Sequence, residues 1–151
     1  MGVKKKNRSY FVWEFGKSPE VAIEIVSNKI GNELGSKLQD YARSGVAYYV
    51  VFDPLHQLGE PMLGIYYLQG KNYILLNNLF LSQVNLGLTI WSGKFEGKEY
   101  NWLRWCDKSG RILLTGDEQA QQERQKAEQE RQRADRLAEI LRQKGINPDE
   151  L

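Results

Sequence analysis

The sequence predicts an α/β protein with a mixed β-sheet core, a flanking helix and a long, charged C-terminal helix. Two segments, 20–26 and 46–52, are nearly continuous runs of apolar residues, which is typical of strands covered on both faces. A helical pattern separates them, and two strands joined by a helix are expected to run parallel. Residues 117–144 consist almost entirely of Gln, Glu, Arg, Lys and Ala, which predicts a solvated helix.

The first half of the core is predicted as a strand followed by a strand–helix–strand unit. Residues 10–15 are aromatic and β-branched, which favours a strand that ends at Gly16. Asn32 can cap a helix that begins at Glu33, in which apolar residues recur at helical spacing. Gly45 is the expected end of this helix, because glycine readily adopts the left-handed conformation there.

The second half of the core is predicted to be mostly strand. Segments 63–68 and 73–76 flank a Gln-Gly-Lys-Asn turn and are expected to form a hairpin. Segments 86–91 and 100–114 are expected to be short strands or ordered loops around several tryptophans. The resulting order of strands around one helix favours a mixed sheet with helices on its faces.

The charged tail has the features of a helix with a defined start. Thr115 and Glu118 form a capping-box pattern, and Gly145 is the expected end. A heptad seam runs through Ala120, Ala127, Ala134 and Leu141. Two interpretations stay open: a single solvated helix, and a coiled-coil homodimer that an alanine seam would hold weakly.

Composition limits the function classes. The chain has 151 residues, 41% of them hydrophobic, and a net charge of +2, which fits one soluble domain and gives no independent support for nucleic-acid binding. Cys106 is the single cysteine, so no internal disulfide can form and a cytoplasmic location is the simplest expectation. His56 alone cannot build a histidine metal site. No apolar stretch is long enough for a membrane span, and no signal-peptide pattern is present.

Glu24 is the unusual residue of the strand predicted at 20–26. A carboxylate between Ile23 and Ile25 is costly in a buried strand unless it is paired or binds a cation. Glu24 could face solvent, or form a structural ion pair with a lysine, or belong to a functional site. Lys37, on the predicted helix, is the lysine expected behind it.

A strand carboxylate followed by a lysine on the next element suits phosphodiester hydrolysis. The acid can hold a divalent cation, which polarises a phosphoryl oxygen and lowers the pKa of a bound water. The lysine can orient that water and offset developing negative charge. Such a site normally needs a second carboxylate on an adjacent strand. The candidates are Glu14, in the strand predicted at 10–15, and Glu20, which lies four residues before Glu24 at the mouth of the same strand and can point to the same face.

Three motifs in this order closely resemble the Uma2 family of bacterial restriction-endonuclease-like proteins, which have the PD-(D/E)XK nuclease fold. They are SPEVAIEIVS at 18–27, KxxxYxxxGV at 37–46 and YYVVFDP at 48–54. The resemblance continues through Gly-Leu at 87–88 and WLRWC at 102–106 into the tail. Each motif is weak alone, and the series is specific in combination.

The resemblance implies a restriction-endonuclease-like fold and a DNA endonuclease that depends on Mg²⁺ or Mn²⁺. In the family the acid of the Glu-x-x-Ser strand is a metal ligand, which falls on Glu24. The lysine usually lies two residues after this acid, where this chain has Val26, so the catalytic lysine falls on Lys37. The first metal-binding aspartate of the fold belongs to an upstream Pro-Asp strand. No Pro-Asp precedes Glu24, so the chain is expected to lack the N-terminal third of the domain.

Two functional hypotheses remain. The first is a metal-dependent endonuclease domain whose partner is DNA, and the second is a non-catalytic remnant that self-associates through its C-terminal helix. The expected boundaries are an N-terminally incomplete nuclease-like domain at 1–114, a helical tail at 115–145 and a disordered end at 146–151. No membrane partner is expected.

Overall fold

The computed structural model describes residues 10–27 and 32–148, which divide into two compact units, Met1–Ile112 and Leu113–Leu151. Most of the turn expected at 28–32 lies outside the described residues, and so do residues 149–151 of the predicted disordered end. The first is built from two β-sheets and two helices, and the second is mainly one long helix.

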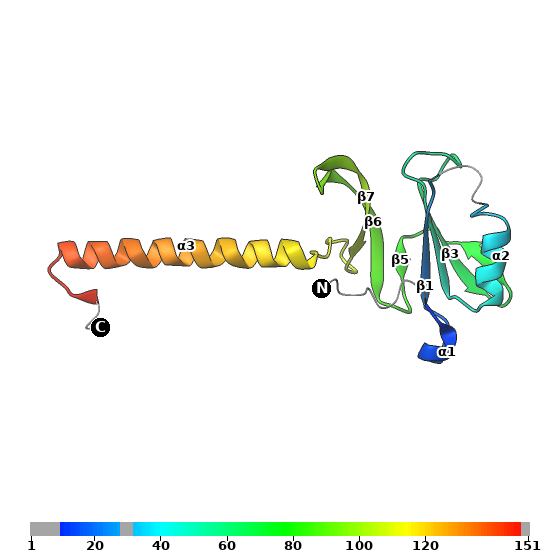
Figure 1. Ribbon diagram of the computed structural model, residues 1–151, viewed down its shortest axis with the longest axis horizontal. Coiled ribbons are helices and arrows are strands. Elements are labelled where there is room, and N and C mark those ends of the chain that lie inside the picture. Colours follow the sequence, from blue (N-terminus) through cyan, green and yellow to red (C-terminus); the bar gives the residue numbers. More distant parts are fainter. Residues whose placement is uncertain (1–9, 28–31, 149–151) are drawn as a thin grey trace, which may run out of the picture. The chain divides into compact units, whose positions relative to one another are not determined.

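The four-stranded sheet A contains the predicted strand–helix–strand unit. Its strands are β1 (Val21–Ile25), β2 (Tyr48–Phe52), β3 (Leu63–Gln69) and β4 (Asn72–Leu75), in the spatial order β1-β2-β3-β4. Figure 1 labels β1 and β3 of this sheet. β1 and β2 are parallel, and the other neighbours are antiparallel. The parallel pair and the hairpin predicted from the sequence are both confirmed.

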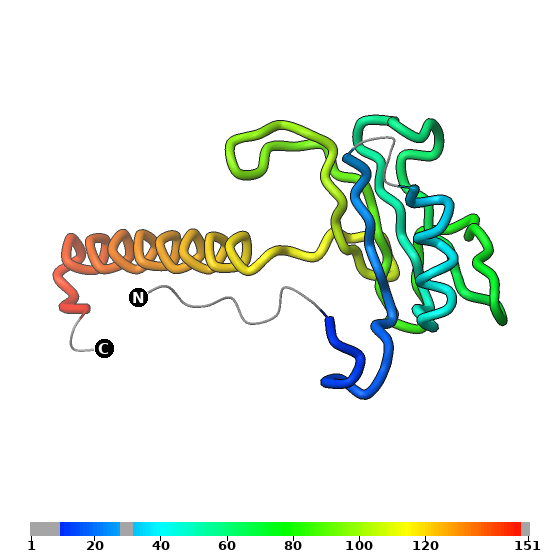
Figure 2. The backbone as a smooth tube through the Cα atoms, turned by 45° about the vertical axis from the view of Figure 1, so that its right-hand side comes forward, coloured from blue at the N-terminus to red at the C-terminus, as the bar shows by residue number. Residues whose placement is uncertain are grey.

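The helix α2 (Ser36–Arg43) connects the two parallel strands and lies on one side of sheet A (Figure 2). It begins three residues later than predicted. Asn32 has a φ of 53°, and Gly35 takes the N-cap position after a turn. A Cβ atom on Gly35 would lie 2.1 Å from the Asn32 side chain, so this turn requires glycine there. The helix ends before Gly45, whose φ of 74° is left-handed, as predicted.

The three-stranded sheet B is antiparallel. It contains β5 (Phe80–Leu81), β6 (Leu86–Phe95) and β7 (Lys98–Cys106), in that spatial order. β6 and β7 extend further toward the turn that joins them than predicted. They pair without interruption from Gly87 and Cys106 at one end to Phe95 and Lys98 at the turn. Beyond Cys106 the predicted strand does not continue, and only an isolated bridge forms to Ile112.

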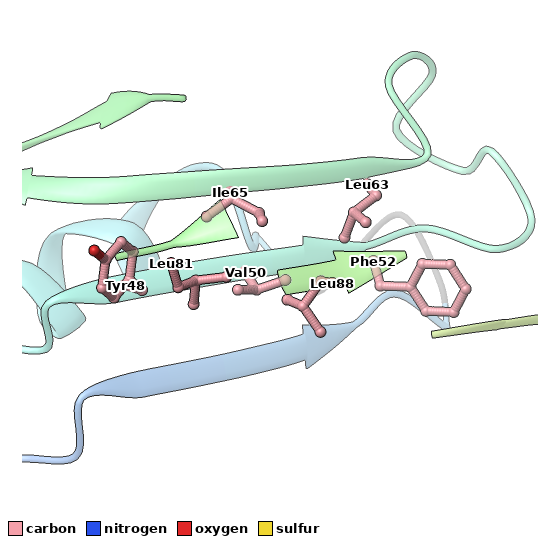
Figure 3. Close-up of a cluster of buried hydrophobic side chains, with 7 residues drawn as sticks. All are labelled: Tyr48, Val50, Phe52, Leu63, Ile65, Leu81 and Leu88. Carbon is pink, nitrogen blue, oxygen red and sulfur yellow. The ribbon is translucent and has the colours of Figure 1, made fainter. Parts of the chain in front are cut away.

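The main core fills the space between the two sheets. It is formed by buried side chains of β2 and β3 from sheet A and of β5 and β6 from sheet B: Tyr48, Val50, Phe52, Leu63, Ile65, Leu81 and Leu88 (Figure 3). On the opposite side of sheet A, Tyr49 and Val51 pack with Val26 against Leu38 and Tyr41 of α2. β2 is therefore buried on both faces, as its continuous apolar sequence predicted.

The prediction of a strand at residues 10–15 is wrong. Residues Val12–Phe15 form a short helix, α1, which ends where Gly16 adopts a φ of 72°. The rings of Tyr10 and Phe15 stack at 4.5 Å, and the Tyr10 hydroxyl donates to the carbonyl of Lys17. These local contacts hold a compact turn, which outweighs the β propensity of the aromatic residues.

The prediction that β1 is covered on both faces is also wrong. Ile23 and Ile25 are 38% and 62% exposed, although Val26 is buried. β1 lies at the end of the strand order of sheet A, so its side chains meet fewer neighbours than those of β2. The same apolar pattern thus describes a half-exposed strand here and a fully buried one in β2.

The second unit consists mainly of α3 (Gly116–Gln143), a helix of 28 residues. The predicted capping box is present: the Glu118 backbone N–H donates to Thr115 Oγ1, and the Glu118 carboxylate accepts from the Thr115 N–H. None of its residues is buried. Among the described residues, no helix has both the length and the apolar character needed to cross a membrane.

Truncating the core between the two sheets should destabilise the first unit. Ile65 is 1% exposed, and we expect Ile65→Ala to lower the free energy of unfolding by about 2–5 kcal/mol, because it removes buried contacts and leaves a cavity. Ile74, on the neighbouring strand, is 43% exposed, and Ile74→Ala should cost less than about 1 kcal/mol. Urea unfolding followed by tryptophan fluorescence measures both, and equal losses would contradict this core.

Candidate functional site

Glu24 lies on the side of β1 that faces α2. Its neighbours on that side, Ala22 and Val26, pack in the cluster beneath the helix. The carboxylate sits among them with 21% of its side chain exposed. The predicted inward orientation of Glu24 is therefore present in the structure, together with an opening to solvent.

Lys37 and Tyr41 lie one turn apart on α2, and each donates a hydrogen bond to a different oxygen of Glu24. Lys37 Nζ is 3.1 Å from Glu24 Oε2, and the Tyr41 hydroxyl is 2.8 Å from Glu24 Oε1. Spacing of four residues places both donors on one helix face. The structure thus brings Glu24 and Lys37 together and adds Tyr41, which holds the carboxylate in a fixed orientation.

Glu33 is a second carboxylate at this site. Its side chain is 5% exposed, and its Oε1 lies 3.5 Å from Lys37 Nζ. The backbone carbonyl of Glu33 accepts a hydrogen bond from the Tyr49 hydroxyl at 3.0 Å, which fixes the turn against β2. Among the described residues, Glu33 Oε2 has no hydrogen-bond partner.

Sequence reasoning missed Glu33 because it assigned the residue to the first turn of a surface helix. The residue instead belongs to the turn before α2, and that turn directs the side chain inward. The signal that could have found it is the spacing of four residues between Glu33 and Lys37, a spacing typical of ion pairs.

The electrostatics of the cluster keep its donors protonated. The hydrogen bond to Glu24 raises the pKa of Lys37 above its ordinary value, so Lys37 remains an ammonium at neutral pH. Burial, together with the hydrogen bond to Glu24, raises the pKa of the Tyr41 hydroxyl. Lys37 therefore acts in this site as a cation, and Tyr41 acts as a hydrogen-bond donor.

The two acids proposed from the sequence as partners of Glu24 lie elsewhere. Glu14 is exposed on the short helix α1. Glu20 is also exposed and forms an ion pair with Lys17, close to it in the sequence. Neither supplies the second carboxylate on an adjacent strand that the sequence analysis called for, because the segment containing Glu14 is not a strand.

Asp53 is a further buried acid, at the end of β2. It is 1% exposed, and its Oδ2 accepts a hydrogen bond from the backbone N–H of Leu58 at 2.6 Å. Its own carbonyl accepts from the N–H of His56. These contacts give Asp53 a local task, which is to fix the loop that leaves β2.

A cavity of about 680 Å³ lies beside the ends of β1 and β2, on the side of sheet A that faces sheet B. Ile25, Phe52, Tyr100 and Trp102 are among its lining residues. Glu24 and Lys37 do not line it, so this cavity is separate from the carboxylate cluster. Cys106 is buried, and burial raises the pKa of its thiol, so it is a packing residue.

The cluster offers carboxylate oxygens to a divalent cation, and one of them, Glu33 Oε2, is buried without a partner. Among the described residues, no group of three or more His, Cys, Asp or Glu side chains could hold a metal. Mg²⁺ usually binds through one or two carboxylates and keeps several waters, so two carboxylates satisfy its requirement. The residues present therefore fit a hydrated cation and do not form a closed cage.

Comparison with known proteins gives one family match. The family model Uma2, described as "Putative restriction endonuclease", matches residues 2–89, which is more than half of the chain and contains the carboxylate cluster. The match ends within β6, so the continuation of the resemblance into 102–106 and the tail stays a prediction. No curated protein and no solved structure gives a significant match.

Removing the cation from the cluster should destabilise the protein. We expect Lys37→Met to lower the free energy of unfolding by about 1–3 kcal/mol at neutral pH, because it leaves the buried Glu33 carboxylate without its partner. The pKa of Lys37 is raised in the folded state, so this contribution is fully present below pH 10.5, the ordinary lysine value, and is lost as the pH rises further. Urea unfolding at neutral and alkaline pH measures the difference.

The matched control for that experiment is Lys17→Met. Lys17 also pairs with a glutamate, but both side chains are exposed to solvent, so its loss should lower the free energy of unfolding clearly less than the loss of Lys37 does. A Lys37→Met protein no less stable than the Lys17→Met protein would contradict the interpretation. Combining Lys37→Met with Glu33→Gln should recover part of the loss, because the buried charge is then removed as well.

Proposed function

Because the chain belongs to the Uma2 family of putative restriction endonucleases, we propose that residues 1–114 form a nuclease-like domain that hydrolyses phosphodiester bonds of DNA, with Glu24 and Lys37 as its catalytic residues. The observation that carries this proposal is the ion pair between Lys37 Nζ and Glu24 Oε2 at 3.1 Å. It joins a strand acid to a helix lysine at a position that is open to solvent, since the Lys37 side chain is 38% exposed.

The proposal includes a divalent cation, because restriction-endonuclease-like proteins generally use one. Glu24 would hold Mg²⁺ or Mn²⁺, which when bound polarises a phosphoryl oxygen and lowers the pKa of a water. Support comes from the donor set of the cluster. The acidic groups that contact Lys37 are the carboxylates of Glu24 and Glu33, and these hard cations prefer carboxylate oxygens.

The chain's own residues have distinct tasks in this proposal. Lys37 stays protonated, so it offsets the negative charge that develops on the phosphoryl oxygens and does not act as a base. Tyr41 donates to Glu24 Oε1 and holds the carboxylate plane. Tyr49, which is fully buried, anchors the turn that carries Glu33. Fixed side chains of this kind are a requirement for positioning a reacting phosphodiester.

Cleavage of plasmid DNA in the presence of Mg²⁺ or Mn²⁺ tests the proposed activity. We expect Glu24→Gln and Lys37→Met each to lower the rate by at least about 100-fold, because each removes a charge that acts on the reacting group. Glu20→Gln and Lys17→Met are the matched controls, since they remove the same charges from an exposed pair. Equal, background-level cleavage by wild type and all four variants would refute a catalytic function.

The second unit favours an additional function, self-association. α3 is 28 residues long and has no buried residue, and it exposes 52% of Leu137 and 42% of Ile140. Leu137 falls at the second apolar position of the heptad that begins at Ala134, and Leu141 begins the next heptad, so the apolar pattern of a coiled coil is confined to this end of α3. We propose a weak homodimer through this end of α3, and it requires no catalytic activity.

Sedimentation velocity over a concentration series tests the proposed homodimer. We expect the full chain to show a reversible monomer–dimer equilibrium that Leu137→Glu shifts to monomer, because it places a charge in the apolar seam. Leu55→Glu is the control, since Leu55 is at least as exposed as Leu137 but belongs to the first unit. A purely monomeric wild type, or a dimer that Leu55→Glu disrupts instead, would contradict association through α3.

A further inference from the structure

Among the described residues, two buried acids keep a carboxylate oxygen without a hydrogen-bond partner, Glu33 Oε2 and Asp53 Oδ1. The other oxygen of Asp53 accepts from the Leu58 N–H, and Asp53 fixes the loop after β2. The other oxygen of Glu33 faces Lys37, the lysine that also pairs with Glu24. Glu33 therefore belongs to the candidate site, because it contacts the same lysine as Glu24, whereas the side-chain contact of Asp53 is with the loop that follows β2.

The carboxylates of Glu24 and Glu33 lie close together because both contact the same ammonium group. Lys37 Nζ is 3.1 Å from Glu24 Oε2 and 3.5 Å from Glu33 Oε1, so these two oxygens are separated by no more than the sum of those distances. Two carboxyl groups and one ammonium carry a formal charge of −1. A buried oxygen with no donor and an excess of negative charge both favour an added cation at this position.

We propose that Glu33 is a ligand of the divalent cation, so that Glu24 and Glu33 together form a two-carboxylate site for Mg²⁺ or Mn²⁺. This inference rests on the proposed function of the same site and assigns its second acid. The acid comes from the turn before α2, whereas the sequence analysis placed candidates on neighbouring strands. Two carboxylates leave coordination positions for water and for a phosphate oxygen, which is how Mg²⁺ is commonly bound.

Lys37 competes with the cation in this arrangement. Its ammonium group contacts one oxygen of each carboxylate, which are the same groups that the cation would use. Its side chain is 38% exposed, so it can turn toward solvent without opening the core. The competition gives the proposal a second, opposite prediction: removing the Lys37 charge should strengthen cation binding, whereas removing the Glu33 charge should weaken it.

Isothermal titration calorimetry of the full chain with Mn²⁺ alone tests the proposal. The measurement needs no DNA and does not depend on catalytic activity. We expect Glu33→Gln to raise the dissociation constant by roughly tenfold or more, because even residues that only support metal ligands typically change affinity by about 10–100-fold. Lys37→Met should lower it. Glu20→Gln is the matched control, because it removes an exposed carboxylate paired with a lysine and should leave the constant unchanged. Near-UV circular dichroism checks that each variant is folded.

The outcomes separate this inference from the proposed nuclease activity. Unchanged Mn²⁺ affinity in a folded Glu33→Gln protein would overturn the assignment of Glu33, even if Glu24→Gln abolished DNA cleavage. Absence of Mn²⁺ binding by the wild-type chain would overturn it as well. Binding that depends on Glu33 in a chain that does not cleave DNA would support the cation site and refute the nuclease.

Discussion

Burial of β2 on both faces is the constraint on which the first unit depends. All five residues of Tyr48–Phe52 are buried, and they alternate between two different environments. Tyr48, Val50 and Phe52 face sheet B, whereas Tyr49 and Val51 face α2. Each face of this one strand thus organises a separate cluster. Since a strand with no exposed face must have both of its layers in place, sheet B and α2 have fixed positions relative to sheet A.

The candidate site follows from the difference between β2 and its parallel neighbour. β1 lies at the end of the sheet. Glu24 therefore lies between Ala22 and Val26, which pack in the cluster beneath α2, and its carboxylate still reaches solvent. A carboxylate at the equivalent depth in β2 would be fully enclosed. The helix that joins the two strands then supplies Lys37 and Tyr41 on the face that covers Glu24, so the connection that creates the parallel pair also completes the site.

The sequence predicted the parts of this structure that depend on local pattern. It predicted β2, the hairpin of β3 and β4, the parallel pair and the capping box of α3, since each is encoded by contiguous residues. It predicted that Lys37 lies on the helix behind Glu24, from their positions on adjacent elements. It did not predict α1, because the stacking of Tyr10 on Phe15 is a specific contact that propensity does not describe. It also missed Glu33, because the left-handed Asn32 and the close approach at Gly35 move the start of α2.

The carboxylate cluster contributes little to the stability of the fold. Taking Glu33 almost completely out of water is costly, and a shared lysine at 3.5 Å compensates that cost only in part. An apolar residue of similar volume at position 33 would pack beneath the same turn without a buried charge. The turn is held by the Tyr49 hydroxyl, which donates a hydrogen bond to the backbone carbonyl of Glu33. This bond does not depend on which side chain stands at position 33. The carboxylate of Glu33 is therefore not needed to form the turn, and its presence beside Glu24 is better explained by a task that requires negative charge.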